Sequence, residues 1–185
     1  MEAVAKKIVM GLTKNTDRSE IQIMKMQLGV EVFLHDFLML SSILIVSYIL
    51  GIFRNTCIMF AAFGIFRLIA GGMHVDSSLG CLISTGATII GGVKITEVVD
   101  FDRWILIPLY VVLIILTTLW APRGTENNPF SVEDSKKMKR YSIALVAVYA
   151  VISYFSKGNL RGLLTMATIF EVLTLIPIRR RKKKE

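Results

Sequence analysis

Residues 67 to 81, RLIAGGMHVDSSLGC, place an arginine, a histidine, an aspartate, two serines and a cysteine between two apolar runs. A cysteine and a histidine together can perform nucleophilic catalysis, because the imidazole takes the thiol proton and later gives it to the leaving group. His74 and Cys81 are seven residues apart, so an unbroken helix would separate them by about 10 Å along its axis. A base must come within about 3 Å of its nucleophile. The pair can therefore act together only if the helix is broken between them.

The sequence contains signals for such a break. The glycine pair at 71–72 can take positive φ and end a helix, and Asp76, Ser77 or Ser78 can cap the next one. With Ser78 as N-cap, Cys81 falls at the third helical position. There the helix N-terminus favours the thiolate, and a neighbouring imidazolium favours it further. The stretch therefore predicts a bend that brings the histidine to an activated thiol.

On the residues alone a plainer interpretation stays open. A histidine in a membrane loop is often only a polar residue at the interface, and a cysteine early in a helix is usually inert. Cys57 is interpreted as a small apolar residue, and about 30 Å of helix separates it from Cys81, too far for a disulfide. With only two histidines and no H-E-x-x-H or C-x-x-C motif, we expect neither a metal nor a cofactor.

The elements that must position these residues are apolar blocks. Hydrophobic residues make up 54% of the 185 residues, and the mean hydropathy is +0.60. A helix that spans a bilayer needs about 20 apolar residues, with about 17 as a lower limit. We therefore predict an all-α polytopic membrane protein with about six transmembrane helices, one of whose short blocks could instead be re-entrant. The expected spans are 37–53, 57–69, 79–93, 104–120, 141–155 and 163–178.

The first 31 residues differ from the rest, since they mix basic, acidic and polar residues and lack the compact apolar core of a signal peptide. Four apolar residues at helical spacing predict an amphipathic helix, which either lies on the membrane surface or caps the bundle: Ile21, Met24, Leu28 and Val32. The expected organisation is an interfacial segment (1–31), a transmembrane domain (32–178) with a catalytic loop (71–81) and a cytoplasmic loop (121–140), and a basic tail (179–185).

The distribution of basic residues predicts the orientation. Sixteen lysines and arginines fall in the amino-terminal segment, the loop 121–140 and the tail, against five on the opposite side. The excess places both termini and the catalytic loop in the cytoplasm. The tail is expected to bind anionic lipids or an acidic partner segment. No aromatic residues interrupt the basic run, so no nucleic acid is expected.

Charged residues inside the spans are costly and call for a partner. Arg67, near the inner end of the second span, could hold a substrate carboxylate, stabilise an oxyanion or neutralise Glu171. Glu171 is expected midway along the last span. Asp76 could orient the imidazole of His74. His35 and Asp36, at the inner end of the first span, are candidates for lining the site.

Nearly the whole chain resembles one family. Arg67 and the following GGMHVDSSLGC are similar to an arginine, glycine, histidine, serine and cysteine core, with His74 and Cys81 at the spacing of its catalytic pair. LGVEVFL, which contains Glu31, is similar to the segment before that family's first span. WAPRGTENNPFSVEDSKKMKRYS resembles its Ala-Pro loop, although NPFSVED is more acidic than expected, and FEVLTLIPI, with Glu171, resembles its last span. The family is accessory gene regulator B (AgrB), the membrane cysteine endopeptidases of Gram-positive quorum sensing.

The resemblance implies a multi-pass protein of the bacterial plasma membrane and a specific reaction. Such proteins cut a precursor peptide of the accessory gene regulator D (AgrD) type, which has an amphipathic amino-terminal helix and an acidic tail. Cys81 would attack at the tail junction with His74 as base, and the resulting thioester would then close to a thiolactone or lactone. Gly72, Asp76, Ser77, Ser78, Arg67, Glu31 and Glu171 are the candidate supporting residues.

Two other classes of protein also fit part of the sequence. A small membrane transporter or peptide export factor, with no covalent chemistry, would place Arg67 and Glu171 in its spans and use the glycines of the third span as a packing or pore seam. A membrane scaffold or sensor would account for the basic patches. The transporter predicts that Cys81→Ala is harmless, whereas the peptidase predicts that it is not. A homodimer stays open.

Overall fold

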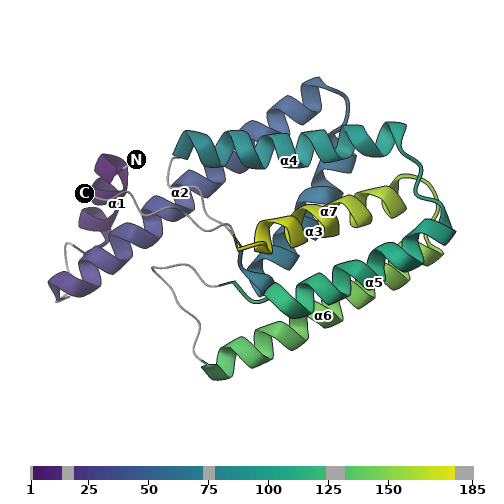
Figure 1. Ribbon diagram of the computed structural model, residues 1–185. Helices are drawn as coiled ribbons and strands as arrows, with labels where there is room; N and C mark the ends of the chain where they lie inside the picture. Colours follow the sequence, from purple (N-terminus) through teal and green to yellow (C-terminus); the bar gives the residue numbers. More distant parts are fainter. Residues whose placement is uncertain (1, 14–18, 73–77, 124–131, 178–185) are drawn as a thin grey trace, which may run out of the picture. The chain divides into compact units, whose positions relative to one another are not determined.

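The computed structural model describes residues 2–13, 19–72, 78–123 and 132–177, and the regular secondary structure in these residues is helical. The described part of the chain contains seven helices (Figure 1). They fall into two compact units, Met1–Leu50 and Gly51–Glu185, which are described separately below.

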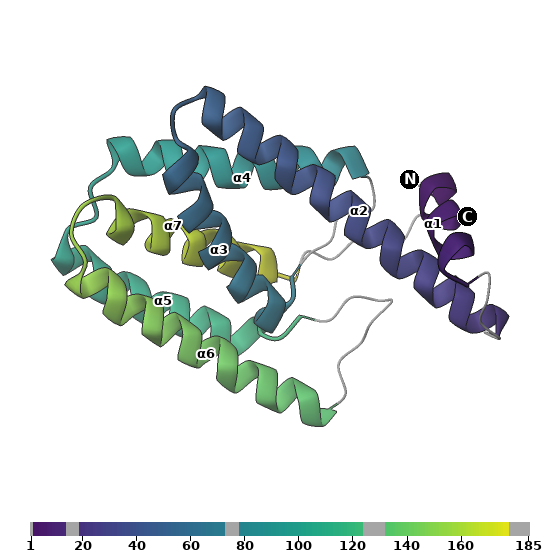
Figure 2. The ribbon, with the colours of Figure 1, turned by 180° about the vertical axis from the view of Figure 1, so that it is seen from behind.

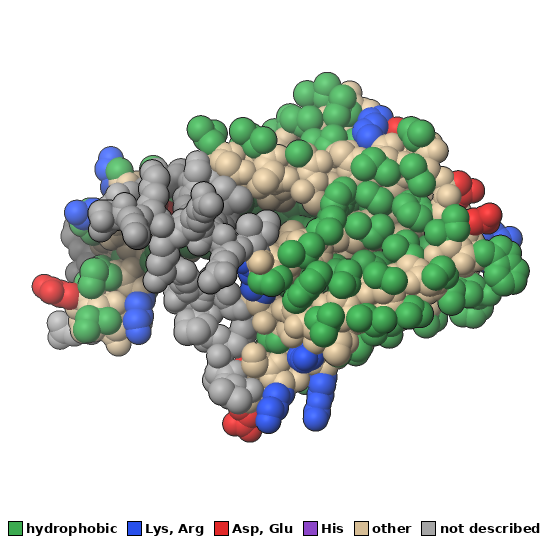
Figure 3. All heavy atoms as spheres, in the orientation of Figure 1, with side chains coloured by type: hydrophobic (Ala, Val, Ile, Leu, Met, Phe, Trp, Pro, Cys, Tyr) green, Lys and Arg blue, Asp and Glu red, His purple; other side chains and the backbone are tan. Residues whose placement is uncertain are grey.

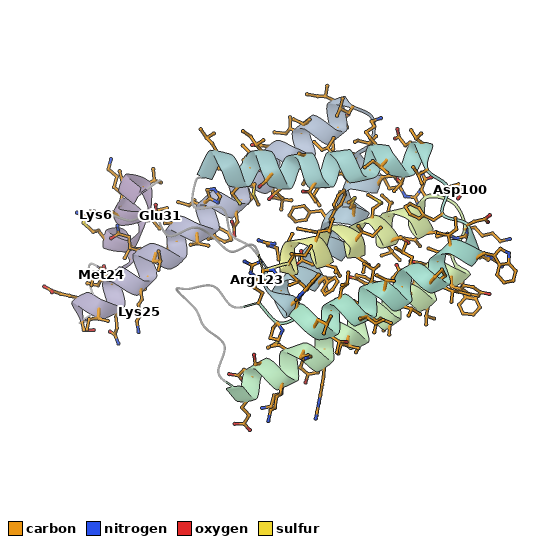
Figure 4. The ribbon with its side chains drawn as sticks, in the orientation of Figure 1. Lys6, Met24, Lys25, Glu31, Asp100 and Arg123 are labelled. Atoms are coloured by element: carbon orange, nitrogen blue, oxygen red, sulfur yellow. The ribbon has the colours of Figure 1, made fainter. Side chains whose placement is uncertain are left out.

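The first unit consists of α1 (Glu2–Thr13) and α2 (Glu20–Ile49). Ser19 caps α2 reciprocally with Gln22, because the Ser19 hydroxyl accepts from the Gln22 N–H and the Gln22 side chain accepts from the Ser19 N–H. The first part of α2 carries the four predicted apolar positions, and all four are exposed: Ile21, Met24, Leu28 and Val32. Met24, Lys25 and Glu31 lie along this part of α2 (Figure 4). The predicted amphipathic segment and the first span are thus one continuous helix.

The second unit is a bundle built around its last helix. Its helices are α3 (Phe53–Ala70), α4 (Ser78–Val98), α5 (Arg103–Trp120), α6 (Val132–Phe155) and α7 (Asn159–Leu175). α7 contacts each of the other four, and the two opposite views show it between α4 and the α5–α6 pair (Figures 1 and 2). Most of α7 is buried, including every residue from 162 to 168. The core of this unit therefore lies along α7.

Five helices of the described chain, α2 to α6, are long and apolar enough to cross a membrane. α7, at 17 residues, meets only the lower limit of about 17 residues for a span. Large apolar side chains face outward, as expected in contact with lipid, and hydrophobic side chains cover most of the second unit in the view of Figure 3. The fold is that of an all-α polytopic membrane protein, as predicted.

Several helix ends differ from the apolar blocks, and two of them show why. The first predicted span runs too far, because α2 ends at Ile49, Gly51 takes φ 70°, and Phe53 already begins α3. Conversely, α6 begins at Val132, before the apolar block that starts at Tyr141. Hydropathy marks where a helix is apolar, and charged residues with good helix propensity extend it further.

Polar side chains join the helices inside the second unit. The hydroxyl of Tyr110 lies 2.9 Å from that of Ser153 and 3.4 Å from that of Thr165, which links α5, α6 and α7. The Tyr149 hydroxyl donates to the Ala62 carbonyl at 2.9 Å and links α6 to α3. Such bonds contribute about 0.6 kcal/mol each on average within membranes. Together they fix the position of α7, which carries Glu171.

The start of α7 is also tied to its surroundings. Arg161 donates to the carbonyl oxygens of Ser153, Ser156 and Phe101, with distances of 2.8 to 3.3 Å. These carbonyls lie at the end of α6 and in the connection from α4 to α5. A single guanidinium therefore holds three segments together at this end of the bundle.

Candidate active site

The candidate site lies at the end of the second unit where α3, α5 and α7 finish and α4 begins. Arg123 marks this end, and Asp100 marks the opposite one (Figure 4). α3 ends at Ala70, and Gly71, at φ 75°, donates its N–H to the Arg67 carbonyl at 2.9 Å. The sequence prediction that the glycine pair ends this helix is confirmed.

Arg67 and Glu171 form an ion pair between α3 and α7. Nη1 of Arg67 lies 3.7 Å from Oε2 of Glu171, whose side chain is 0% exposed, whereas that of Arg67 is 31% exposed. Neither Glu171 carboxylate oxygen has a hydrogen-bond partner among the described residues. Arg67 also lies over the Phe63 ring, with 5.9 Å between its guanidinium carbon and the ring centroid. Of the three roles predicted for Arg67, the structure supports neutralisation of Glu171.

The two charged residues lie closer to the ends of their helices than to the middle. Arg67 is in the last turn of α3. Glu171 is near the C-terminal end of α7, which finishes at Leu175, so its predicted place midway along the span is wrong. The prediction extended the apolar block to Ile178, whereas the helix ends earlier. The ion pair consequently lies at the last turn of α3.

Gly72 brings the main chain directly against this ion pair. A Cβ atom at Gly72 would lie 2.7 Å from Oγ1 of Thr174, 2.8 Å from Nη1 of Arg67 and 3.2 Å from Oε1 of Glu171. Gly72 also has φ 139°, a conformation that side-chain-bearing residues rarely adopt. Only glycine fits this position, so its place among the candidate residues has a physical reason.

Cys81 lies in the first turn of α4, which begins at Ser78. Its side chain is half-buried, with Sγ 4.0 Å from Oγ1 of Thr85. The helix begins within one residue of the predicted start, in which Ser78 was the N-cap. Cys57 lies within α3, and neither cysteine is in a disulfide.

Several predicted residues fall in the part of the chain that the structure does not describe. His74, Asp76 and Ser77 lie outside the described residues, as does the side chain of Ser78. The contact between His74 and Cys81 therefore stays a prediction.

The remaining candidates belong to the first unit. Glu31 is half-buried on α2, and the Nδ1 atom of His35 lies 3.3 Å from Oδ1 of Asp36. Their part in the site stays a prediction. Among the described residues, no group of three or more His, Cys, Asp and Glu side chains could hold a metal ion.

Arg123 was missed as a site residue by the sequence analysis. Its N–H donates to the Ala70 carbonyl at 2.8 Å, and its carbonyl accepts from the Gly72 N–H at 3.3 Å. Its Nη1 donates to the Thr174 carbonyl at 3.2 Å and to the Ile176 carbonyl. The only signal in the sequence was an arginine directly after an apolar block, which is also what the orientation of a span would require.

The fold and the site define an all-α membrane protein with a cysteine at the start of one helix and an ion pair between two others. The family described as AgrB, accessory gene regulator B, matches residues 5–175. The chain belongs to this family.

Curated relatives agree with this membership. The putative AgrB-like protein of Clostridium acetobutylicum is 25% identical over 180 residues, which are 96% of this chain and 86% of the relative. The accessory gene regulator protein B of Staphylococcus aureus is 27% identical over 90% of this chain and 88% of its own length. That of Staphylococcus epidermidis is 28% identical over 90% and 86%. No solved structure matches the chain.

Proposed function

We propose that this protein is a membrane cysteine endopeptidase of quorum sensing, which removes the acidic tail from an AgrD-type precursor peptide and promotes closure of the remaining peptide to a ring. The observation that carries the proposal is the position of Cys81. Its half-buried thiol lies in the first turn of α4, at the end of the bundle where Arg67, Gly72 and Glu171 meet. Membership of the AgrB family supports the same conclusion.

The first step is an acyl transfer to the enzyme. His74 takes the thiol proton of Cys81, and Sγ attacks the carbonyl carbon of the peptide bond before the tail. The carbon–nitrogen bond then breaks, the departing amine receives the proton from His74, and the peptide stays on Cys81 as a thioester.

The second step closes the ring. A thiol or hydroxyl within the bound peptide attacks the thioester carbonyl, and the Cys81 sulfur leaves and regains its proton. If the inner nucleophile is a thiol, one thioester is exchanged for another, so the step is nearly isoenergetic. Water must be excluded, because hydrolysis would waste the intermediate. A site at the ends of membrane helices meets this need.

The supporting residues have distinct proposed roles. Arg67 is held by Glu171 with part of its guanidinium exposed, so it can also reach a substrate carboxylate or the oxyanion. Gly72 lets the main chain pass close to this pair. Asp76 would orient His74, and Ser77 and Ser78 would cap α4, while Glu31 stays a candidate supporting residue.

Charge favours the proposed substrate. The first turns of α6 carry basic residues, most of them exposed: Lys136, Lys137, Lys139 and Arg140. α3 and α5 end, and α6 begins, at the same end of the bundle as the candidate site. We place this end, both termini and the active site in the cytoplasm, where the basic residues would attract an acidic peptide tail and anionic lipids.

The test is tail release by the full-length chain in lipid vesicles. A set of synthetic AgrD-type peptides is added, and mass spectrometry follows the released tail and a peptide adduct on the protein. Cys81→Ala and His74→Ala should abolish release, and the adduct of the unaltered chain should be cleaved by hydroxylamine, as a thioester is. Cys57→Ser is the matched control, because it removes the other free thiol and should leave release unchanged.

Two results would contradict the proposal. If Cys81→Ala still releases the tail, the thiol is not the nucleophile. If the unaltered chain cleaves none of the peptides but moves them across the vesicle membrane, the transporter alternative is correct.

A second measurement needs no substrate. In Cys57→Ser protein, the rate at which a maleimide alkylates Cys81 is measured at neutral pH with and without His74→Ala. We expect the unaltered histidine to speed alkylation, because it favours the reactive thiolate. Equal rates would mean that the two residues are not coupled in the resting protein.

A further inference from the structure

Arg123 connects the ends of two helices that both contribute to the candidate site. Its main chain bonds to Ala70 and Gly72 at the end of α3, with distances of 2.8 and 3.3 Å. Its guanidinium reaches the carbonyl oxygens of Thr174 and Ile176 at the end of α7. Arg123 lies beside the C-terminal end of α7 in Figure 4. One residue thus joins the C-terminal end of α3 to the C-terminal end of α7.

The side chain is suited to this connection. The last carbonyl groups of a helix lack partners within the helix, and they carry partial negative charge. The planar guanidinium of Arg123 donates to two carbonyls in this region, which the single ammonium group of a lysine cannot do with the same geometry. Residue 123 is therefore held against α7 by its side chain and against α3 by its main chain.

Gly71 is the counterpart of Arg123 on α3. A Cβ at Gly71 would lie 2.2 Å from the Arg123 carbonyl oxygen, and Gly71 has φ 75°. Both facts restrict this position to glycine. Since a backbone atom cannot move aside as a flexible side chain can, the close approach of the two segments depends on Gly71.

We propose that Arg123 is a positioning residue for the cysteine peptidase reaction. It fixes the point at which the chain leaves α3, immediately before the segment that carries His74, and it holds that point against the helix that carries Glu171. The inference rests on the proposed function, because a positioning role requires a reaction that depends on His74. Arg123 acts through Gly72 and α7, not by contact with the peptide.

A different role for Arg123 would be to bind a carboxylate of the acidic tail, since it is a cation at the proposed cytoplasmic end. The two roles differ in what they predict. A tail-binding arginine affects KM and leaves the unliganded protein unchanged. A positioning arginine affects kcat and the local main chain before any peptide is added.

The experiment compares Arg123→Ala and Arg123→Lys with the unaltered chain in lipid nanodiscs. Hydrogen exchange is measured without peptide for fragments that cover residues 68–72 and 120–123. Steady-state tail release then gives kcat and KM. Arg54→Ala is the matched control, because Arg54 is an exposed arginine at the start of α3, at the opposite end of the same helix.

We expect Arg123→Ala to speed exchange several-fold at both fragments and to lower kcat on the order of tenfold or more, since small misplacements of reacting groups are costly. KM should change less than about twofold. Arg123→Lys should give exchange rates and a kcat between those of Arg123→Ala and the unaltered chain. Gly71→Ala should reproduce the effect from the α3 side. Arg54→Ala should leave exchange and kcat unchanged.

Three results would overturn the inference. Unchanged exchange in Arg123→Ala would mean that the side chain does not hold the two helix ends. Faster exchange with unchanged kcat would mean that the connection is structural only. A raised KM with normal kcat would assign Arg123 to the peptide instead. Failure of the proposed function is distinguishable, because it is seen as tail release by Cys81→Ala, whatever Arg123 does.

Discussion

At the scale of single residues, Gly72 is the position where the main chain meets a buried ion pair. The spaces that a methyl group would need are occupied by the polar atoms of Thr174, Arg67 and Glu171. The backbone conformation at φ 139° adds to the cost. Strain of this kind amounts to about 1–3 kcal/mol per residue, so a substitution here would either shift the chain or disturb the pair.

We therefore expect Gly72→Ala to lower tail release strongly while the protein still inserts and folds. Gly64→Ala is the control, because Gly64 lies in α3 with nothing within 4 Å of its Cβ position. Tail release and unfolding in a denaturant titration in micelles are measured for both. Normal release by Gly72→Ala would show that the chain can pass the ion pair at a greater distance.

The ion pair itself allows a second prediction. Removing one partner of a buried pair costs about 3–5 kcal/mol, whereas replacing both by apolar residues is often nearly neutral. Arg67→Leu and Glu171→Leu should each lower the free energy of unfolding, and the double variant should recover most of the loss. Denaturant titration of the four proteins measures the coupling.

Tail release, measured in the same four proteins, distinguishes a structural role of Arg67 from a role in the reaction. If Arg67 acts on the substrate as well as on Glu171, the double variant regains stability but not tail release. Additive losses of stability without recovery would contradict the pairing of Arg67 with Glu171.

These residues also show what could and could not be predicted from the sequence for single positions. Glu171 could be expected to need a partner, because an isolated carboxylate in a span is costly. That the partner is Arg67 was one of three alternatives, since residues 104 positions apart have no spacing rule that joins them. The role of Arg123 could not be distinguished from that of the other basic residues of its loop, because it depends on main-chain hydrogen bonds.

At the scale of helices, α4 packs closely on its neighbours at one glycine and not at the next. A Cβ at Gly92 would lie 2.1 Å from Cε of Met59 and 2.8 Å from Cε2 of Phe170, whereas a Cβ at Gly91 would meet nothing within 4 Å. The predicted glycine seam of this helix is therefore a packing surface at Gly92.

The two neighbouring glycines provide a matched pair. Gly92→Ala should destabilise the protein by about 1–3 kcal/mol, because Met59 is fully buried and has little room to move. Gly91→Ala should be neutral or stabilise by about 0.5–1 kcal/mol, since alanine favours the helix. Thermal unfolding in micelles compares them. Equal effects would show that α4 does not pack on α3 and α7 at this register.

Most helices could be predicted from apolar blocks, but their ends could not. The block 104–120 is nearly the whole of α5 (Arg103–Trp120). By contrast, the break between α2 and α3 lies inside an apolar run and depends on the positive φ of Gly51. Hydropathy cannot distinguish a continuous helix from two helices joined by a tight turn, because both remain apolar.

At the scale of the whole molecule, the number of membrane crossings decides on which side the C-terminus lies. Five described helices satisfy the length and composition of a span, and α7 has 17 residues. α7 is also the most enclosed helix of its unit, so it needs less contact with lipid than the others. We expect it to cross the membrane, which makes six crossings and places both termini in the cytoplasm.

Reporter fusions test this count. A cytoplasmic fluorescent reporter should be active at either terminus, and a reporter that requires export should be inactive at both. In protein without its native cysteines, Asp100→Cys should react with an impermeant maleimide added outside intact cells, whereas Glu133→Cys should react only after lysis. Both sites are exposed. Opposite sides for the two termini would mean that α7 does not cross.

At this scale the sequence predicts the class of the protein but not the arrangement of its helices. The class follows from the high proportion of apolar residues and from their arrangement in long blocks. That the last helix is the centre of the second unit could not be foreseen, because the order of helices in the chain carries no information on which of them is enclosed. The burial of residues 162 to 168 is what identifies it.

The central position of α7 has a consequence for synthesis. The helix that contacts each of the other helices of the second unit, and that carries the partner of Arg67, is translated after all four of them. Until it leaves the ribosome, α3 and α4 have no α7 to pack against and Arg67 has no Glu171. A nascent chain therefore lacks the Arg67–Glu171 pair until α7 has been made. Under the proposed function, tail release is expected only from chains in which α7 has already been inserted.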